Sequence, residues 1–227
     1  MFFFSSRSWT QRTWWEIACE QTEIAHYEEP NAAQFYIELK GIEPKIWRRL
    51  VLPLETNLAQ LHRILQAAFG WTESHLHYFV IGGLRYGDAD FFESERLDED
   101  EPRTFEAADV CIRDFTFYRS ENASFEYVYD FGDNWTHEIT FEKLLALSPA
   151  PKTASCIEGA RCCPPEDVGG ASGYEEFLRV LLHPEEDEIE EQRHLKRWSG
   201  GRFNPERFDC AKADKAVRGA LRKQHRS

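Results

Sequence analysis

The sequence predicts an α+β fold, a mostly antiparallel sheet with one early helix packed on it and a helical C-terminal segment. Three observations lead to this prediction. Residues 125–141 alternate apolar and polar side chains on either side of a turn, which is typical of a β-hairpin with one buried face. Residues 57–70 show helical spacing, and helical patterns gather again after residue 170. Strands that precede a group of helices favour α+β over alternating βαβ units.

The length and composition indicate one large domain, or one domain with extensions. The chain has 227 residues, of which 42% are hydrophobic, so it can bury a sizeable core. Its formal net charge of -13 argues against sequence-independent binding to a phosphate backbone, although a local basic patch could still bind nucleic acid. No segment approaches the roughly 20 apolar residues of a membrane-spanning helix. We therefore expect a cytoplasmic protein with no membrane partner.

The chain is predicted to have three parts. Residues 1–32 form an N-terminal arm rich in tryptophan, residues 33–209 form the domain proper, and residues 210–227 form a basic helix that packs on the same domain. In the first half of the domain the patterns predict strands at 35–39, 46–52, 75–81, 84–86 and 109–118, and a helix at 58–69 between Asn57 and Gly70.

After the hairpin, residues 156–173 have the composition of a long irregular loop, and ordered loops of this length are usually functional. Ser172 and Glu175 match a capping box, which predicts that a helix starts after Ser172. Further helices are predicted at 185–198 and from Cys210 onward, the latter after Asn204 and Pro205.

The hairpin tip carries the densest set of groups that could do chemistry. Asp130, Asp133 and His137 could hold a divalent metal together with Glu166 and Asp167 from the loop, and with His75 or His77 from the neighbouring strand. Carboxylates with imidazole suit magnesium, manganese or zinc, and such a site could activate water for hydrolysis. The alternative is structural. In that case the two hairpin aspartates bond backbone amides of the turn, and the histidine is a core residue.

Six cysteines occur without a C-x-x-C pair, so most should be free thiols in a reducing cytoplasm. Cys156, Cys162 and Cys163 could bind zinc with His137 as the fourth ligand. However, five residues separate the first two, which exceeds the usual spacing, and adjacent cysteines rarely bind one zinc together. Buried thiols are the alternative. The metal candidates are therefore Asp130, Asp133, His137, His75, His77, Cys156 and Cys163.

Two basic segments could contact nucleic acid. Lys45 and Arg48 flank Trp47, whose ring could stack on a base, and the last helix has a basic face that includes Lys215, Arg218 and Arg222. Strand alternation, however, places Trp47 and Arg49 on the face opposite Arg48. Arg49 could then be a buried partner for an acidic residue such as Asp130.

Several motifs together resemble one known family. They are W-R-R at 47–49, L-H-x-x-L-Q-x-A-F-G-W at 61–71, H-L-H at 75–77, Y-D-F-G-D-x-W-x-H at 129–137 and C-x-x-G-x-x-x-C-P-P-E-D-x-G-G-x-x-G-Y at 156–174. The joint pattern runs from Phe35 to Asp209 and resembles the plasmid pRiA4b ORF-3-like family. The resemblance implies an α+β fold and an occurrence on plasmids, mobile elements and chromosomes. Some members are labelled as resolvase-like passenger proteins, and the resemblance supplies no catalytic residues.

Two functions are consistent with these observations. We favour a non-enzymatic module of a mobile element or its host that binds protein or nucleic acid. The alternative is a metal-dependent, nuclease-like hydrolase whose carboxylates and histidine lie at the hairpin tip, with a divalent metal as cofactor. The hydrolase should lose activity in Asp133→Ala while it stays folded, whereas in the binding module the same change should only loosen the turn. The partner and the oligomeric state stay open.

Overall fold

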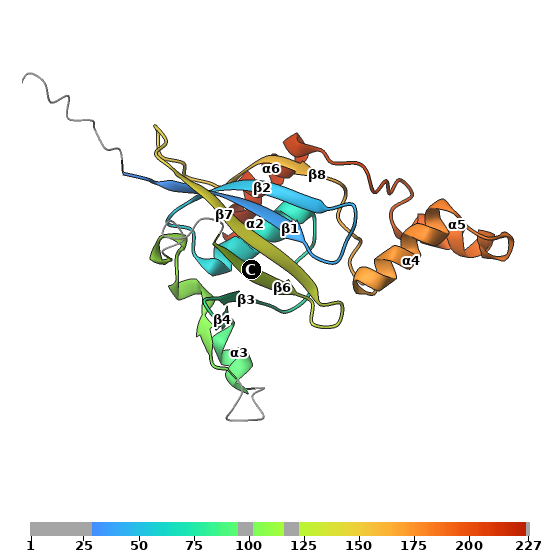
Figure 1. The fold of residues 1–227 in the computed structure, drawn as a ribbon, viewed down its shortest axis with the longest axis horizontal. Coiled ribbons are helices and arrows are strands. Elements are labelled where there is room, and N and C mark those ends of the chain that lie inside the picture. The colour runs from blue at the N-terminus through green and yellow to red at the C-terminus, as the bar shows by residue number, and fades with distance from the viewer. Residues whose placement is uncertain (1–28, 95–101, 116–122, 226–227) are drawn as a thin grey trace, which may run out of the picture.

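The computed structural model describes residues 29–94, 102–115 and 123–225, and it confirms the predicted α+β fold (Figure 1). Its centre is an 8-stranded sheet in the order β5-β4-β3-β6-β7-β1-β2-β8. Neighbouring strands are antiparallel except β4 and β5, which are parallel. Most of the predicted N-terminal arm, residues 1–28, lies outside the described residues. The strands are β1 Ala32–Leu39, β2 Ile46–Pro53, β3 His77–Ile81, β4 Leu84–Gly87, β5 Thr104–Glu106, β6 Ser124–Tyr129, β7 Trp135–Leu145 and β8 Ser155–Ala160.

The predicted central hairpin is present as β6 and β7. Its register pairs Tyr129 with Trp135 next to the turn. The first hairpin, β1 and β2, joins the sheet through β7, while β3 joins it through β6. The hairpin therefore lies in the middle of the sheet, so its turn is held by neighbours on both sides.

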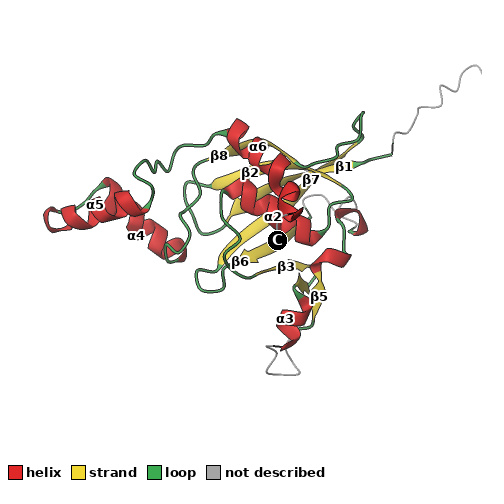
Figure 2. Ribbon diagram, turned by 180° about the vertical axis from the view of Figure 1, so that it is seen from behind, coloured by secondary structure: helices red, strands yellow, loops and turns green. Residues whose placement is uncertain are grey.

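The helices are α2 Leu58–Phe69, α3 Ala89–Ser94, α4 Gly170–Leu182, α5 Ile189–Trp198 and α6 Cys210–Gly219. α2 is the early helix of the prediction. Asn57 and Gln60 form its capping box, and Gly70 ends it in the left-handed conformation with φ of 91°. Figure 2 shows α2 and α6 on one face of the sheet, and they cover the buried side chains of the strands. α6 packs against both α2 and β8.

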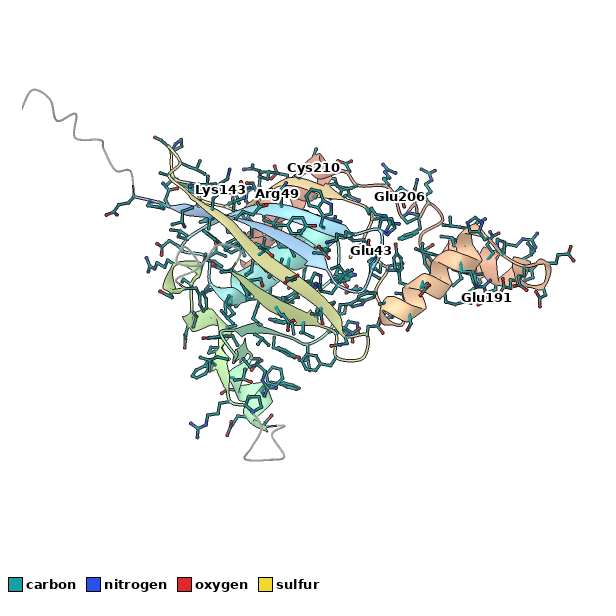
Figure 3. The ribbon with its side chains drawn as sticks, in the orientation of Figure 1. Glu43, Arg49, Lys143, Glu191, Glu206 and Cys210 are labelled. Carbon is teal, nitrogen blue, oxygen red and sulfur yellow. The ribbon has the colours of Figure 1, made fainter. Side chains whose placement is uncertain are left out.

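The opposite face of the sheet is open and polar. The side chains on this face alternate with the buried positions of β1 and β2, and they include Tyr36, Glu38, Trp47 and Arg49. Figure 3 shows Arg49 on this face with Lys143 further along β7. Arg49 forms ion pairs with Glu142 and Glu158. The prediction that it pairs with a buried acidic residue such as Asp130 is therefore wrong.

The remaining two helices stand apart from the sheet. α4 and α5 form a helical hairpin that extends away from the strands, as Figures 1 and 2 both show. Short 3₁₀ turns precede α5 and follow α6, at 186–188 and 220–225. None of the helices in the described part of the chain is long and apolar enough to cross a membrane.

Several predicted boundaries are wrong. Ser155–Ala160 is the edge strand β8, paired with β2, and not loop. α4 begins at Gly170, so Ser172 lies inside its first turn. The start of the helix is fixed by its N-cap Gly169, which is left-handed, and by the adjacent turn of the β6–β7 hairpin. Residues 107–109 and 112–114 form 3₁₀ turns where a strand was predicted from 109, and residues 116–118 lie outside the described part. α5 begins four residues later than predicted, at Ile189.

Candidate functional site

The turn of the central hairpin is held by its own aspartate. Asp130 has a positive φ of 58°, which aspartate tolerates better than most residues. Its Oδ1 accepts hydrogen bonds from the backbone N–H groups of Gly132 and Asp133, at 3.0 and 3.3 Å. Asn134 has φ of 53° and donates its N–H to the Asp130 carbonyl. The turn therefore uses one carboxylate oxygen of Asp130 and leaves Oδ2 for other partners.

The loop after β8 meets this turn. Asp133 Oδ2 accepts a hydrogen bond from Gly169 N at 3.1 Å. A Cβ at Gly170 would lie 2.7 Å from the Asp133 carbonyl oxygen, and Gly170 has φ of 69°. Only glycine fits such an approach. The start of α4 is consequently seated on the hairpin turn, so the loop and the hairpin tip are in contact.

Three side chains converge at this junction. His75 Nε2 lies 3.1 Å from Asp167 Oδ1 and 3.5 Å from Asp130 Oδ2. The three potential ligand atoms all lie within 4.8 Å of one another. Asp130 is buried and the Asp167 side chain is 72% exposed, so a cation could enter from the Asp167 side. An imidazole with two carboxylates is a donor set that suits zinc, manganese or magnesium.

Glu166, the neighbouring candidate, is bound on both of its oxygens. Oε1 accepts from Tyr129 Oη at 2.7 Å and from Thr72 N at 3.2 Å, and Oε2 accepts from the Thr72 hydroxyl. Partial burial alone would raise the pKa of Glu166, but these hydrogen bonds outweigh it and lower the pKa. Through these hydrogen bonds, the Glu166 carboxylate joins the loop to the segment that precedes β3.

His137 lies elsewhere, inside the core. It is 0% exposed, and its ring packs edge-on against Phe69 and Trp71 at centroid distances of 4.7 and 5.3 Å. Neither ring nitrogen makes a hydrogen bond of normal geometry within the described chain. Burial lowers the pKa of His137 to about 3, and the carbonyls of Tyr127 and Trp135 offset this only in part. The structure therefore keeps His137 neutral and away from the hairpin tip.

His77 is also separate from the junction. Its ring stacks on that of His62 with a centroid distance of 3.5 Å and an interplanar angle of 2°. Burial lowers the pKa of His77 to about 4 and that of His62 to about 3. Two stacked neutral rings are a packing contact. Of the two histidines predicted from the third strand, His75 is the one that faces the aspartates.

The cysteine candidates do not form a metal site. The residues that the structure describes contain one group of three potential ligands within 4.8 Å, and it includes neither Cys156 nor Cys163. Burial raises the pKa of Cys156 to about 12 and that of Cys163 well above its ordinary value, so both stay protonated. Zinc binds thiolates, which these surroundings disfavour. The two thiols fill the core.

The basic candidates are divided between the surface and the interior. Lys45 pairs with Glu38 at 2.8 Å and Arg218 with Asp214 at 2.6 Å. Trp47 packs on Tyr36 on the open face of the sheet. Arg48 is 2% exposed and so cannot contact nucleic acid from the surface. Lys215 and Arg222 remain exposed, without a carboxylate partner among the described residues.

A groove adjoins the junction on the α4–α5 hairpin. It has a volume of about 340 Å³, and Asp167 lines it as well as the cluster with His75. Its floor is apolar and consists of Val168, Phe177, Val180, Leu195 and Trp198. Carboxylates stand at its rim, from Asp167, Glu176 and Glu191, with His194 beside them, and Glu176 forms an ion pair with Arg179 at 2.7 Å. We call this the acidic-rim groove.

Comparison with known proteins places the chain among relatives. A family model described as "Plasmid pRiA4b ORF-3-like protein" matches residues 31–212. The chain belongs to this family. It is 36% identical over 157 residues to the uncharacterized protein y4hQ of Sinorhizobium fredii (strain NBRC 101917 / NGR234), which covers 68% of this chain and 75% of that protein. It also resembles the crystal structure of a protein of unknown function, MM3350 from Methanosarcina mazei Go1, with a TM-score of 0.66, 31% identity and coverage of 80% and 95% of the two chains.

The family motifs include residues that the analysis of the sequence did not single out. His62 and Gln66, in the L-H-x-x-L-Q motif, both bond the hydroxyl of Tyr127, at 2.8 and 3.0 Å. Helical periodicity could have placed both on the buried face of α2, because they follow Leu58 at spacings of four and eight residues. Thr72 was also missed, and only the folded structure shows that it contacts Glu166.

Proposed function

We propose that the protein is a non-enzymatic module that binds a segment of a partner protein in the acidic-rim groove. The observation that carries the proposal is the groove itself, an apolar floor with three carboxylates at its rim, on a helical hairpin that stands clear of the sheet. Figure 3 shows Glu191 on this hairpin, far from the strands. Trp198, at 44% exposed, offers the largest apolar contact surface in the groove.

The charges around the groove favour a protein partner over nucleic acid. The rim carboxylates of Asp167 and Glu191 repel phosphates, and the acidic turn at 186–188 precedes α5. A partner segment with an apolar residue between lysines or arginines matches both the floor and the rim. We extend the proposal to a cytoplasmic module of a mobile element or its host, which the free thiols of the described cysteines support.

The positions of the predicted catalytic groups support a non-enzymatic function. Asp133 caps the start of α4, Glu166 is bound on both oxygens, and His137 is neutral and fully buried. A general base must reach the proton that it removes, and the hydrogen bonds of Glu166 and the burial of His137 prevent this for those two groups.

Selection from a display library of random peptides tests the proposal. The peptides enriched on the wild-type protein should carry an apolar residue flanked by Lys or Arg. They should not bind Glu191→Gln/Trp198→Ala, which removes one rim charge and the main floor residue. The matched control is Glu186→Gln/Leu182→Ala, a change of the same kind on the same hairpin but outside the groove. Enrichment of acidic peptides, or equal binding to both variants, would reject the proposal.

A second candidate function is that of a metal-dependent hydrolase, which the cluster of His75, Asp130 and Asp167 favours. A cation there would have three protein ligands and free positions for water. Elemental analysis of the purified protein, alone and after incubation with zinc or manganese, tests it. About one metal per chain, lost in His75→Ala, would support this candidate. A metal content that is the same in wild type and His75→Ala would rule it out.

A further inference from the structure

A further cavity of the described chain lies away from both the hairpin tip and the acidic-rim groove. It has a volume of about 540 Å³ and is enclosed by the end of α2, the two adjacent cysteines, the segment between α5 and α6, and the first turns of α6. Four of its lining residues are cationic and one is acidic: Arg48, Arg202, Arg207, Lys212 and Asp209. We call it the basic pocket. Its sign is opposite to the net charge of the chain, which is -13.

Arg48 lines this pocket and is a buried cation that forms no ion pair with a carboxylate of the described residues. Its guanidinium donates four hydrogen bonds to backbone carbonyls, those of Ala68, Trp47, Ala160 and Arg161, at 2.7 to 3.0 Å. A guanidinium has five N–H groups, so one N–H on Nη2 has no acceptor within the described chain. The side chain is 2% exposed and rests on the Phe208 ring, with Cζ 4.1 Å from the centroid. A desolvated charge of this kind is costly unless an anion compensates it.

The other three cations surround the mouth of the pocket. Arg202, Arg207 and Lys212 are exposed, and within residues 29–94, 102–115 and 123–225 none of them forms an ion pair with a carboxylate. Asp209, the single acidic residue of the lining, is used as the N-cap of α6, where its Oδ1 accepts from Lys212 N at 2.9 Å. Cys162 lies near three of the cations. Arg48, Lys212 and Arg207 each lower the pKa of its thiol, although burial has the larger effect and raises that pKa.

The wall that carries these cations is fixed in place. Arg161 is 8% exposed and its guanidinium binds Glu206 at 2.6 Å. Cys162 N donates to the Pro205 carbonyl at 2.9 Å. These two contacts join the segment before α6 to the end of β8. The pocket is therefore formed before any ligand binds, which lowers the entropic cost of binding.

We propose that the basic pocket binds a small molecule that carries a phosphate group beside an apolar part. Several guanidinium and ammonium groups around one point match the charge and the many acceptor oxygens of a phosphate. Phe69, Phe203 and Phe208 supply apolar wall on the same lining. The volume is in the range of pockets that bind small molecules and cofactors. This site is independent of the proposed protein-binding groove.

Thermal unfolding with added ligands tests the proposal, followed by calorimetric titration of those that stabilise. The probes are inorganic phosphate, ribose 5-phosphate, adenosine and AMP, with a single-stranded oligonucleotide to test nucleic acid. AMP, which combines phosphate with a flat apolar base, should raise the melting temperature by roughly 5 to 10 °C at about 100 times its dissociation constant. Phosphate and ribose 5-phosphate should give smaller shifts, and adenosine none.

Variants locate the binding site. Arg202→Ala/Arg207→Ala/Lys212→Ala should weaken AMP binding by at least about tenfold, since each lost charged contact contributes on the order of 1 to 3 kcal/mol. Lys143→Ala/Lys152→Ala/Lys215→Ala changes the net charge equally at exposed positions outside the pocket and should bind as wild type does. The proposal is overturned if no phosphate-bearing probe stabilises the wild type, if both triple variants lose binding equally, or if only the oligonucleotide binds.

Discussion

Three histidines are buried in a form that resists protonation. His62 of α2 stacks on His77 of β3, and His137 packs against Phe69. Burial lowers the pKa of each, to about 3 for His62 and His137 and to about 4 for His77. In the unfolded chain the same groups titrate near pH ~6.5. Above that pH they are neutral in both states. Below it the unfolded chain takes up protons that the folded chain cannot.

The free energy of unfolding should therefore fall as the pH drops from about 6.5 toward 4, by on the order of 1.4 kcal/mol per pH unit for each buried histidine. Urea unfolding at a series of pH values measures this slope. His137→Leu removes one of the three groups and should reduce the slope by about a third, whatever it does to stability at neutral pH. An unchanged slope in this variant would show that His137 takes up a proton in the folded state.

Asp133 separates the structural and the catalytic interpretations of the hairpin tip. Its Oδ2 accepts from Gly169 N and so holds the start of α4. Asp133→Ala should lower the free energy of unfolding by about 1 kcal/mol, as the loss of one hydrogen bond does. Chemical unfolding measures it, with Asp187→Ala as an exposed control that should have no effect. If Asp133→Ala is as stable as wild type, the capping contact contributes nothing.

At the scale of elements, the loop of residues 163–169 joins the hairpin to the segment that enters β3. Trp71 Nε1 donates to the Pro164 carbonyl at 3.0 Å. Glu166 accepts hydrogen bonds from Tyr129 Oη and Thr72 N. Burial raises the pKa of Tyr129, and its hydrogen bond to Glu166 raises the pKa further. Tyr129 is consequently a donor at all ordinary pH values.

Glu166→Ala should destabilise the protein by roughly 2 to 3 kcal/mol, because it removes charge-assisted hydrogen bonds from two elements together. Tyr129→Phe should cost less, and the double variant should show a coupling of about 0.5 kcal/mol or more. Glu175→Ala, on the exposed side of α4, is the control. Strict additivity of Glu166→Ala and Tyr129→Phe would contradict a shared contact.

Patterns in the sequence correctly predicted those helices and strands whose structure is determined by residues within the element itself. The hairpin 125–141 and the helix with Asn57 and Gly70 at its ends are present because alternation, capping and a left-handed glycine are properties of neighbouring residues. β8 was missed because Ser155–Ala160 is an edge strand whose partner β2 is about a hundred residues earlier, and its small and polar residues give no alternation. The start of α4 depends on contact with the distant Asp133, which no local pattern contains.

The candidate site could be predicted in part for the same reason. Asp130 and Asp133 were expected to bond the backbone amides of the turn, and Asp130 does so, whereas the side chain of Asp133 accepts from Gly169 N of the later loop. That Asp167 lies beside His75 depends on how the loop folds back, which sequence spacing does not give. Alternation placed His137 on the apolar face, and the structure shows it buried there. Arg48 was expected at the surface because arginine usually is, but backbone carbonyls hold it in the interior.

At the scale of the whole molecule, the chain separates its charges. The acidic-rim groove lies on the α4–α5 hairpin, and the basic pocket lies beyond it, where the chain returns to the sheet through α6. The open face of the sheet exposes paired charges such as Lys40 with Glu138. A partner with positive charge is thus directed to the hairpin and a small anion to the pocket.

The affinity of the groove for a basic peptide tests the central claim most directly. A synthetic peptide with one aromatic or leucine residue flanked by lysines, titrated into the whole protein by calorimetry, should bind with a dissociation constant that rises with salt. Glu191→Gln/Trp198→Ala should weaken binding by about tenfold or more, which corresponds to about 1.4 kcal/mol, while Glu186→Gln/Leu182→Ala should bind as the wild type does. Equal affinity of the wild type and the groove variant would contradict the account.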